Sequence, residues 1–468
     1  MAKSKKAHER CMSEWIQEND SIDTSFLYRS LREEYLKNGE SVEVDFRKLV
    51  DWIKLGDQLT HQIHSYPAKL LPNIAHFFCR AKTLYVGHKT LIDPFSGSGT
   101  VALEGSLAGF DTFVLDANPL AALVTKVKTI PYNPQELLFY KNKILQHVKT
   151  LRKAPVVDVV NHHLWYFPES KRKLELLLKS IRSIVQEKEI LDFFLVCFSA
   201  VARKLSLADP AISVPVRIKE KVFFTTSKNE KIKKHIEWVK NEDPVQEFSR
   251  ICQSNMDRIA QTNGLYPNRK AAIVIGNDAK KLSSYNIPRE RLEGEEGVSL
   301  IITSPPYGSA QKYIRASSLS LNWLGYATPH ELAELEAKSI GREHLPRFRE
   351  CARDVELSPE FESLLARVEK KNKLRAGITR QYLYEMRVAL VEMSKAVIPG
   401  GYAILVVGNN SVCGEPLRND KFIIEVMAGL GMKMELMLID NIKSRGLMVK
   451  RNKTASVISR ESVLVFKK

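Results

Sequence analysis

The sequence has no long apolar run and no paired cysteines, and both absences narrow the range of functions. Its longest apolar stretch, residues 193–202, is far too short to span a bilayer. The first residues are charged and hold no apolar core, so we expect no secretory signal. The six cysteines are scattered, without a Cys-x-x-Cys pair or a histidine at zinc spacing. They indicate reduced thiols and no metal site, and the sequence thus predicts a cytoplasmic protein without a membrane partner.

The composition indicates the class of partner. The chain has 468 residues, of which 44% are hydrophobic and 27% are charged, as is typical of a globular protein of two or three domains. Its formal net charge is +17. Clustered lysines and arginines favour polyanions, because their contact with phosphates releases condensed counterions. Nucleic acid is therefore the first candidate partner, and a generally basic protein is the alternative.

A glycine-rich turn follows a short apolar strand at residues 91–100, LIDPFSGSGT. A helix is predicted from Val101, and a second strand, residues 113–116, ends on Asp116. This order is typical of a nucleotide-type site, where glycines let the backbone approach the ligand and the acid binds ribose hydroxyls. The third glycine of the dinucleotide fingerprint and the Gly-Lys-Ser/Thr of a P-loop are both absent. The turn therefore suits a ligand with ribose and adenine but no pyrophosphate, such as S-adenosylmethionine (SAM).

A second candidate for ligand binding precedes this turn. Residues 66–69, YPAK, interrupt the chain, and residues 70–78 then carry apolar side chains at helical spacing. A loop that enters a helix N-terminus can bind a carboxylate, and Lys69 would add a positive charge there. The alternative is a surface helix that begins at a proline.

A third motif lies at residues 299–308, SLIITSPPYG. Its apolar residues 300–302 predict a strand buried on both faces, as in a parallel sheet. The two prolines fix φ and supply no N–H donors, so the strand must end in a rigid loop. Open α/β sheets bind ligands at the carboxyl ends of their strands, where this loop would lie. A stiff turn without chemistry is the alternative.

The remaining pattern predicts one doubly wound α/β sheet. Strands near residues 91, 113, 272, 300 and 403 are linked by helices and followed by a closing pair of strands, residues 432–439 and 462–466. Residues 131–270 lack this alternation and are predicted to be largely helical. Within them, residues 217–240 combine many lysines with aromatic side chains, which indicates a DNA groove or a solvated amphipathic face.

The motifs at 93–100 and 303–307 resemble the cofactor loop and the catalytic loop of SAM-dependent amino-directed DNA methyltransferases. The chain is most similar to those that methylate the N4 amino group of cytosine. The likeness covers roughly residues 61–120, 270–325 and 380–468. Supporting matches are residues 66–69, Asp116, Asp278 and residues 399–401, 407–410 and 461–466.

The resemblance implies a Rossmann-like sheet of seven strands, the last one antiparallel, with a helical insertion for target recognition. We accordingly expect an N-terminal helical extension at 1–60, the cofactor-binding half at 61–130 and the helical insertion at 131–270. The catalytic part would follow at 271–326, a helical excursion at 327–380 and the rest of the sheet at 381–468.

The resemblance also implies the site residues. Those of the catalytic loop are Ser304, Pro305, Pro306 and Tyr307. Those that would bind SAM are Lys69, Asp93, Pro94, Phe95, Gly97, Gly99, Thr100, Asp116 and Asp278. Phe95, Gly97 and Gly99 would hold the methionine end with Lys69 near its carboxylate, Asp116 would bind the ribose, and Asp278 would accept from the adenine amino group.

The expected reaction is methyl transfer to an exocyclic amino group in double-stranded DNA. Hydrogen bonds from the amino protons to Ser304 Oγ and the Pro305 carbonyl would localise the nitrogen lone pair for attack. The base must leave the duplex, and Tyr307 would stack on it. The resemblance places such an enzyme in a restriction–modification or related defence system, with a cognate restriction endonuclease as a further partner. Alternatives are an adenine-N6 enzyme, which usually carries Asp or Asn at the position of Ser304, an RNA guanine-N2 methyltransferase, and a non-catalytic subunit that binds SAM or DNA.

Overall fold

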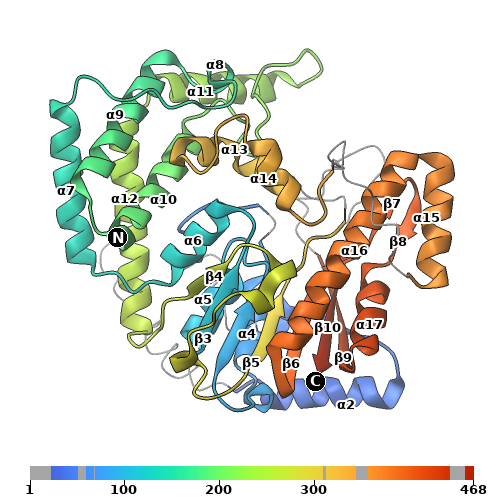
Figure 1. Cartoon of the computed structure of the whole chain (residues 1–468). Helices are drawn as coiled ribbons and strands as arrows, with labels where there is room; N and C mark the ends of the chain where they lie inside the picture. The colour runs from blue at the N-terminus through green and yellow to red at the C-terminus, as the bar shows by residue number, and fades with distance from the viewer. Residues whose placement is uncertain (1–22, 51–58, 68, 309–311, 344–356, 443–458) are drawn as a thin grey trace.

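A computed structural model describes residues 23–50, 59–67, 69–308, 312–343, 357–442 and 459–468 of the chain. One large sheet runs through its centre, in the order β1-β9-β10-β6-β5-β2-β3-β4 (Figure 1). Its strands are β1 (Val42–Val44), β2 (Thr90–Asp93), β3 (Asp111–Leu115), β4 (Ile273–Gly276), β5 (Val298–Thr303), β6 (Val397–Gly408), β9 (Lys433–Asn441) and β10 (Arg460–Lys467). A separate hairpin pairs β7 (Asn410–Val412) with β8 (Glu415–Leu417).

The predicted doubly wound sheet is confirmed. All neighbouring strands are parallel except β10, which lies antiparallel between β6 and β9. The sheet has one strand more than the seven expected, because β1 from the N-terminal region pairs with β9 and becomes the edge strand. Residues 42–44, within the predicted N-terminal helical extension, form this strand, and three residues are too few to show a strand period.

Strands β2, β3 and β5 are buried at every residue, which explains their nearly continuous apolar sequences. From β2 the chain continues to β3 on one side, whereas β5 is the neighbour of β2 on the other side. The strand order thus reverses between β2 and β5. In an open parallel sheet, the carboxyl ends of two such strands enclose a crevice suited to a ligand.

Two layers of helices cover the faces of the sheet. Residues Leu91 and Leu300 point into one core, and their neighbours Ile92 and Ile301 point into the other. The first layer contains α2 (Ser25–Asn38), α3 (Phe46–Leu49), α4 (Pro72–Cys79) and α5 (Thr100–Leu107). The second contains α15 (Pro359–Lys371), α16 (Lys373–Ala396) and α17 (Asn419–Gly429). Short 3-10 turns are η2 (Leu59–Gln62), η3 (Lys82–Leu84), η4 (Ala279–Ser284) and η5 (Arg289–Arg291).

A group of helices with a core of its own lies beside strands β3 and β4 (Figure 1). Its members are α6 (Pro119–Thr129), α7 (Pro134–Thr150), α8 (His162–Trp165), α9 (Pro168–Ile184), α10 (Lys188–Lys204), α11 (Thr226–Asn241) and α12 (Pro244–Leu265). Helices α13 (Tyr313–Leu324) and α14 (Leu332–Lys338) follow the motif at residues 303–307. Where these segments divide into domains stays a prediction, and residues 344–356 of the expected excursion lie outside the described residues.

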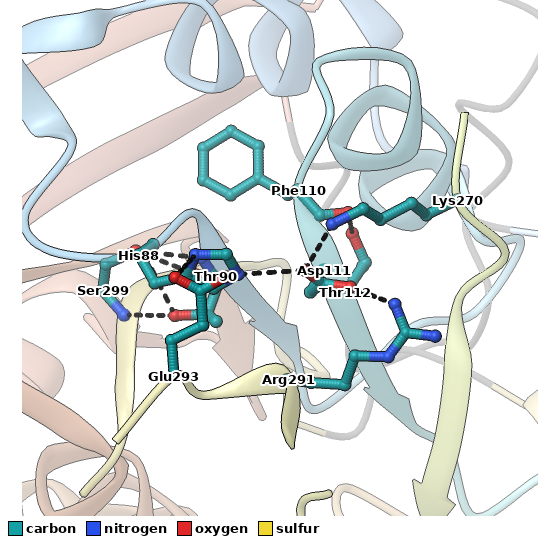
Figure 2. Close-up of polar contacts among 9 residues, drawn as sticks. All are labelled: His88, Thr90, Phe110, Asp111, Thr112, Lys270, Arg291, Glu293 and Ser299. Atoms are coloured by element: carbon teal, nitrogen blue, oxygen red, sulfur yellow. Dashed lines mark hydrogen bonds and ion pairs between the residues drawn. The ribbon is translucent and has the colours of Figure 1, made fainter. Parts of the chain in front are cut away.

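A polar network joins the amino ends of the central strands, at the end of the sheet opposite the crevice (Figure 2). Asp111 Oδ2 accepts hydrogen bonds from Lys270 Nζ at 2.6 Å and His88 Nε2 at 3.0 Å, and Asp111 Oδ1 accepts one from Arg291 Nη1 at 3.0 Å. Burial alone would raise the pKa of Asp111, but these donors lower it below its ordinary value. The carboxylate therefore stays charged and holds together segments that are distant in the sequence.

Candidate functional site

A pocket opens at the carboxyl ends of β2 and β5. The loop that follows β2 and the loop that follows β5 both contribute residues to its walls. The pocket is lined by Tyr66, Pro94, Phe95, Gly97, Asp116, Ala117, Asn118, Asn277, Asp278, Ala279, Ser304, Pro306, Tyr313, Lys338, Ser339 and Ile340. The structure thus brings together residues from six separate segments of the sequence, between residues 66 and 340.

The glycine-rich loop is shaped by close backbone contacts. Gly99 has a φ of +72° at the start of α5, and a Cβ there would lie 2.8 Å from Cα of Thr125. Only glycine fits so tightly in the left-handed region. Lys128 is fully buried beneath the loop and donates a hydrogen bond to the carbonyl of Ser98. These contacts fix the loop in the form that faces the pocket.

Asp116 holds the loop after β2 against the end of β3. Its Oδ2 accepts a hydrogen bond from the Gly97 amide at 2.8 Å, and its Oδ1 accepts one from the Asn118 amide at 2.8 Å. Burial raises the pKa of Asp116 to about 6, although both amides favour the charged form. A partly exposed carboxylate of this kind can accept further hydrogen bonds from hydroxyl groups in the pocket.

Asp93, at the end of β2, connects the loop after β2 to the end of β5. Its Oδ1 accepts hydrogen bonds from the Phe95 amide at 3.1 Å and from Thr303 Oγ1 at 2.7 Å. Phe95 belongs to the loop after β2, and Thr303 is the last residue of β5. Burial raises the pKa of Asp93 to about 7, because the charged form is poorly solvated there. One carboxyl group therefore sets the spacing between the two pocket walls.

The loop after β5 is held by residues of the second helical layer and of the last strands. Pro306 accepts a hydrogen bond at its carbonyl from Tyr382 Oη at 3.0 Å. Asn410 donates its side-chain amide to the carbonyl of Gly308. Tyr307 is buried, and its Oη lies 3.2 Å from Ser304 Oγ and 3.0 Å from Glu461 Oε1. The loop thus presents Ser304 to the pocket from a rigid frame.

The predicted site residues fall into two groups. Those that line the pocket are Pro94, Phe95, Gly97, Asp116, Asp278, Ser304 and Pro306. The others are not among the lining residues: Asp93, Gly99, Thr100, Pro305 and Tyr307, which are buried, and Lys69. Lys69 Nζ donates to the carbonyl of His61 at 2.8 Å. The roles assigned to all of these residues stay predictions.

Sequence reasoning missed several residues of the pocket. Asn118 donates hydrogen bonds from Nδ2 to Tyr66 Oη at 3.0 Å and Ser317 Oγ at 2.9 Å, and its Oδ1 caps α6. An Asn-Pro pair at a helix start is a capping signal that could have identified Asn118. Residues 338–340 belong to a segment without a motif, and no local signal places them in the pocket.

The described residues show neither a metal-binding cluster nor a membrane-spanning helix. Among the described residues, no group of three or more His, Cys, Asp or Glu side chains could hold a metal ion. The helices described here are all too short or too polar to cross a membrane.

Comparison with known proteins finds sequence similarity to methyltransferases. No protein-family model matches the chain. Methyltransferase M.MvaI of Kocuria varians, a type II enzyme, is 25% identical over 389 residues, which cover 79% of this chain and 81% of that protein. The chain resembles type II methyltransferases. M.AvaI of Nostoc sp., also a type II methyltransferase, is 23% identical over 376 residues, or 75% of this chain and 74% of that protein.

Two further likenesses are weaker. The type II methyltransferase M.MjaII of Methanocaldococcus jannaschii is 29% identical over 154 residues, which cover 31% of this chain and 28% of that protein. Among solved structures, the rRNA methyltransferase aviRa of Streptomyces viridochromogenes covers 90% of this chain and 96% of its own, with 10% identity and a TM-score of 0.31. A TM-score this low carries no argument about fold or function.

Asp93 and Asp111 should affect stability in opposite directions. The folded state holds a proton on Asp93 up to about pH 7, whereas an unfolded aspartate releases it near pH 4, so this group lowers stability as pH rises between the two. We predict that Asp93→Asn raises the free energy of unfolding at pH 8 by up to about 4 kcal/mol relative to the parent, and that the gain vanishes near pH 4. Urea unfolding at both pH values measures it.

Asp111→Asn is the matched control for this measurement. The lowered pKa of Asp111 gives stability that is present above the ordinary aspartate pKa and lost as pH falls. Its partners are partly exposed, so the variant should lose about 1 kcal/mol at pH 8. A loss of stability at pH 8 in both variants would contradict the assignment of the Asp93 pKa.

Proposed function

We propose that the chain is a DNA methyltransferase that transfers a methyl group from SAM to the N4 amino group of a flipped-out cytosine. The observation that carries the proposal is that Ser304, Pro306, Gly97 and Asp116 line the same pocket. The resemblance to type II methyltransferases over three quarters of the chain supports the same class of reaction.

The residues present fit the cofactor. Asp116 offers carboxylate oxygens to the pocket while two backbone amides fix its orientation, as ribose hydroxyls require. Asp278 caps η4 and lines the same pocket, where it would accept from an adenine amino group. Aromatic rings of Phe95, Tyr66 and Tyr313 line the pocket, and ring faces attract a cation such as a sulfonium. SAM would supply a methyl group already activated by that positive charge.

The protein side of the reaction consists mainly of positioning. A cytosine amino group is a poor nucleophile, because its lone pair is delocalised into the ring. Ser304 Oγ, on the pocket wall, would accept one amino hydrogen, and the Pro305 carbonyl would accept the other. Both hydrogen bonds favour a pyramidal nitrogen with a localised lone pair. Holding that nitrogen in line with the methyl group then supplies much of the rate.

The partner proposed is double-stranded DNA, within a restriction–modification or related defence system. The relatives are named type II methyltransferases, which supports this role. A base inside a duplex cannot reach the bottom of the pocket, so it must rotate out of the stack. A cognate restriction endonuclease would be the functional partner, and both would act in the cytoplasm.

The decisive experiment identifies the product. Labelled SAM and unmethylated DNA of mixed sequence are incubated with the protein, and the digested nucleosides are separated by mass spectrometry. We expect N4-methylcytosine, with Ser304→Ala slowing transfer while SAM binding is retained. N6-methyladenine would keep the cofactor but overturn the choice of base. SAM binding without a DNA product would favour RNA substrates, and no methyl transfer to either nucleic acid would favour a non-catalytic subunit.

Affinity for SAM should depend on the ionisation of Asp116. The charged carboxylate accepts at both oxygens, whereas the neutral acid is a weaker acceptor and donates from one of them. Because the pKa of Asp116 is about 6, acid weakens its capacity to accept hydrogen bonds from the ribose. We predict that the dissociation constant of SAM rises as pH falls through about 6. Asp116→Asn should bind at least about tenfold more weakly at pH 8 and lose this pH dependence.

Calorimetric titration of SAM at several pH values tests this prediction. Ser304→Ala is the matched control, because it removes a polar group from the facing wall without changing Asp116. An affinity of the parent that stays constant across pH 6 would contradict the proposed contact with Asp116.

The segment before α11 is the surface that fits DNA best among the described residues. Val222 and Phe223 are 104% and 79% exposed, which is unusual for adjacent apolar side chains. Lys221 Nζ lies 5.4 Å from the centre of the Phe223 ring, and Lys228 Nζ lies 3.7 Å from that of Phe224. Lysines can bind phosphates while an apolar side chain enters between bases. We therefore favour residues 131–270 over residues 327–380 for target recognition.

Substitutions in this segment should weaken DNA binding without affecting SAM binding. Phe223→Ala removes the exposed ring, and Lys221→Ala removes one phosphate contact, which should lower the salt dependence of log K by about 0.9. Fluorescence anisotropy with a labelled duplex at several salt concentrations measures both effects. Phe26→Ala is the control, because Phe26 is 72% exposed on α2, far from α11 (Figure 1). Equal affinity of Phe223→Ala and Phe26→Ala for DNA would exclude the segment as a contact.

A further inference from the structure

A chain of three side chains leads from the pocket to the last strand of the sheet. Ser304 lines the pocket, and its Oγ lies 3.2 Å from Tyr307 Oη. Tyr307 Oη lies 3.0 Å from Oε1 of Glu461, a partly buried residue of β10. The chain therefore joins the pocket wall to a carboxylate that is distant in the sequence and outside the pocket lining.

The chemistry of the three groups fixes the direction of the hydrogen bonds. An ionised carboxylate only accepts, and it lies nearer to Tyr307 Oη (3.0 Å) than the carbonyl oxygen of Val406 does (3.5 Å), so Tyr307 donates its single hydrogen to Glu461. Burial and the nearby charge of Glu461 raise the pKa of Tyr307 well above its ordinary value, so the phenol keeps that hydrogen. Ser304 must then donate to Tyr307. Its Oγ is left facing the pocket as an acceptor.

We propose that Glu461 is a positioning residue for methyl transfer and receives the released proton through Tyr307 and Ser304. The inference rests on the proposed function and adds to it the route by which the proton leaves. Without Glu461, the hydroxyl of Ser304 could equally turn its hydrogen toward the pocket, where it would oppose an amino donor.

Every bond that forms in this reaction is matched by one that breaks, and the released proton ends on Glu461. A nitrogen–carbon bond forms as the sulfur–methyl bond of the donor breaks, and the amino nitrogen becomes positively charged. One N–H bond then breaks, and its proton moves to Ser304 Oγ as the hydrogen of Ser304 passes to Tyr307 Oη. The hydrogen of Tyr307 passes to Glu461, which becomes a neutral acid. Glu461 is partly exposed and can release the proton to water.

The surroundings of Glu461 favour uptake of a proton. Burial raises its pKa above the ordinary value, and the neighbouring carboxyl of Asp440 raises it further. The hydrogen bond from Tyr307 and the charge of Arg47 act in the opposite direction. These groups come from β9, the catalytic loop and α3, the described elements around this side chain. Glu461 is thus a better proton acceptor than a glutamate in water.

Two variants separate this route from a structural role. Glu461→Gln keeps an oxygen that can accept from Tyr307 but is a far weaker base, and Tyr307→Phe keeps the ring but breaks the chain. We expect each to lower the single-turnover rate of DNA methylation by about 100-fold, with KM for DNA and affinity for SAM unchanged. The double variant should be no slower, because the residues act as one unit.

The pH profile gives the second measurement. The rate of the parent should fall as pH drops through the pKa of Glu461, since a protonated acid cannot accept the proton. Glu461→Gln should lose this acidic limb. Glu435→Gln is the control, because Glu435 is a buried carboxylate of β9 that pairs with Arg32 and should leave the profile unchanged. Melting curves establish whether each variant is folded. If Glu461→Gln does not fold, the rate and pH profile of Tyr307→Phe test the proton route instead.

The outcomes distinguish the route from the proposed function. A parent protein that transfers no methyl group to DNA overturns the proposed function, and the route with it. A parent that is active, with Glu461→Gln or Tyr307→Phe equal to it in rate and pH profile, overturns the route alone. Loss of DNA affinity instead of rate would show a structural role and would also overturn it.

Discussion

The carboxyl group of Asp93 is the constraint on which the site depends. It accepts hydrogen bonds from the amide of Phe95 and the hydroxyl of Thr303, and so couples the two loops that line the pocket. Neither wall could move independently without leaving a buried polar group unsatisfied, which is costly in a low-dielectric interior. The free energy lost by burying this carboxyl group is offset at the amino ends of the strands, where Asp111 is charged and well paired.

Throughout the sheet, apolar strands provide the framework and polar loops carry the functional groups. Strands β2, β3 and β5 are buried at every residue and contribute little polar chemistry until they end. Polar side chains then appear together at their carboxyl ends, where Asp93, Asp116 and Ser304 lie. A rigid apolar sheet thus positions short polar loops, which is why loop residues, rather than core residues, would determine the chemistry.

The central part of the fold could be predicted from sequence because its signals are local. An apolar run that ends at two prolines, and a glycine turn between a strand and a helix, need no knowledge of distant residues. Strand β1 has only three residues and no visible period, and it was missed. Asn118 and residues 338–340 reach the pocket through tertiary packing, and Glu461 meets Tyr307 only because β10 pairs with β6. Such encounters have no signature in a single sequence.

The position of β10 has a consequence for the order of folding. Strands β1 and β9 are joined to the rest of the sheet only through β10, and β10 follows every other strand in the chain. Among the described strands, β1 and β9 therefore can pair only with each other until β10 has paired with β6. Closing such long loops costs chain entropy before any contact compensates, which makes the step slow. Because Glu461 arrives with β10, the pocket gains its link to this carboxylate only as the sheet is completed.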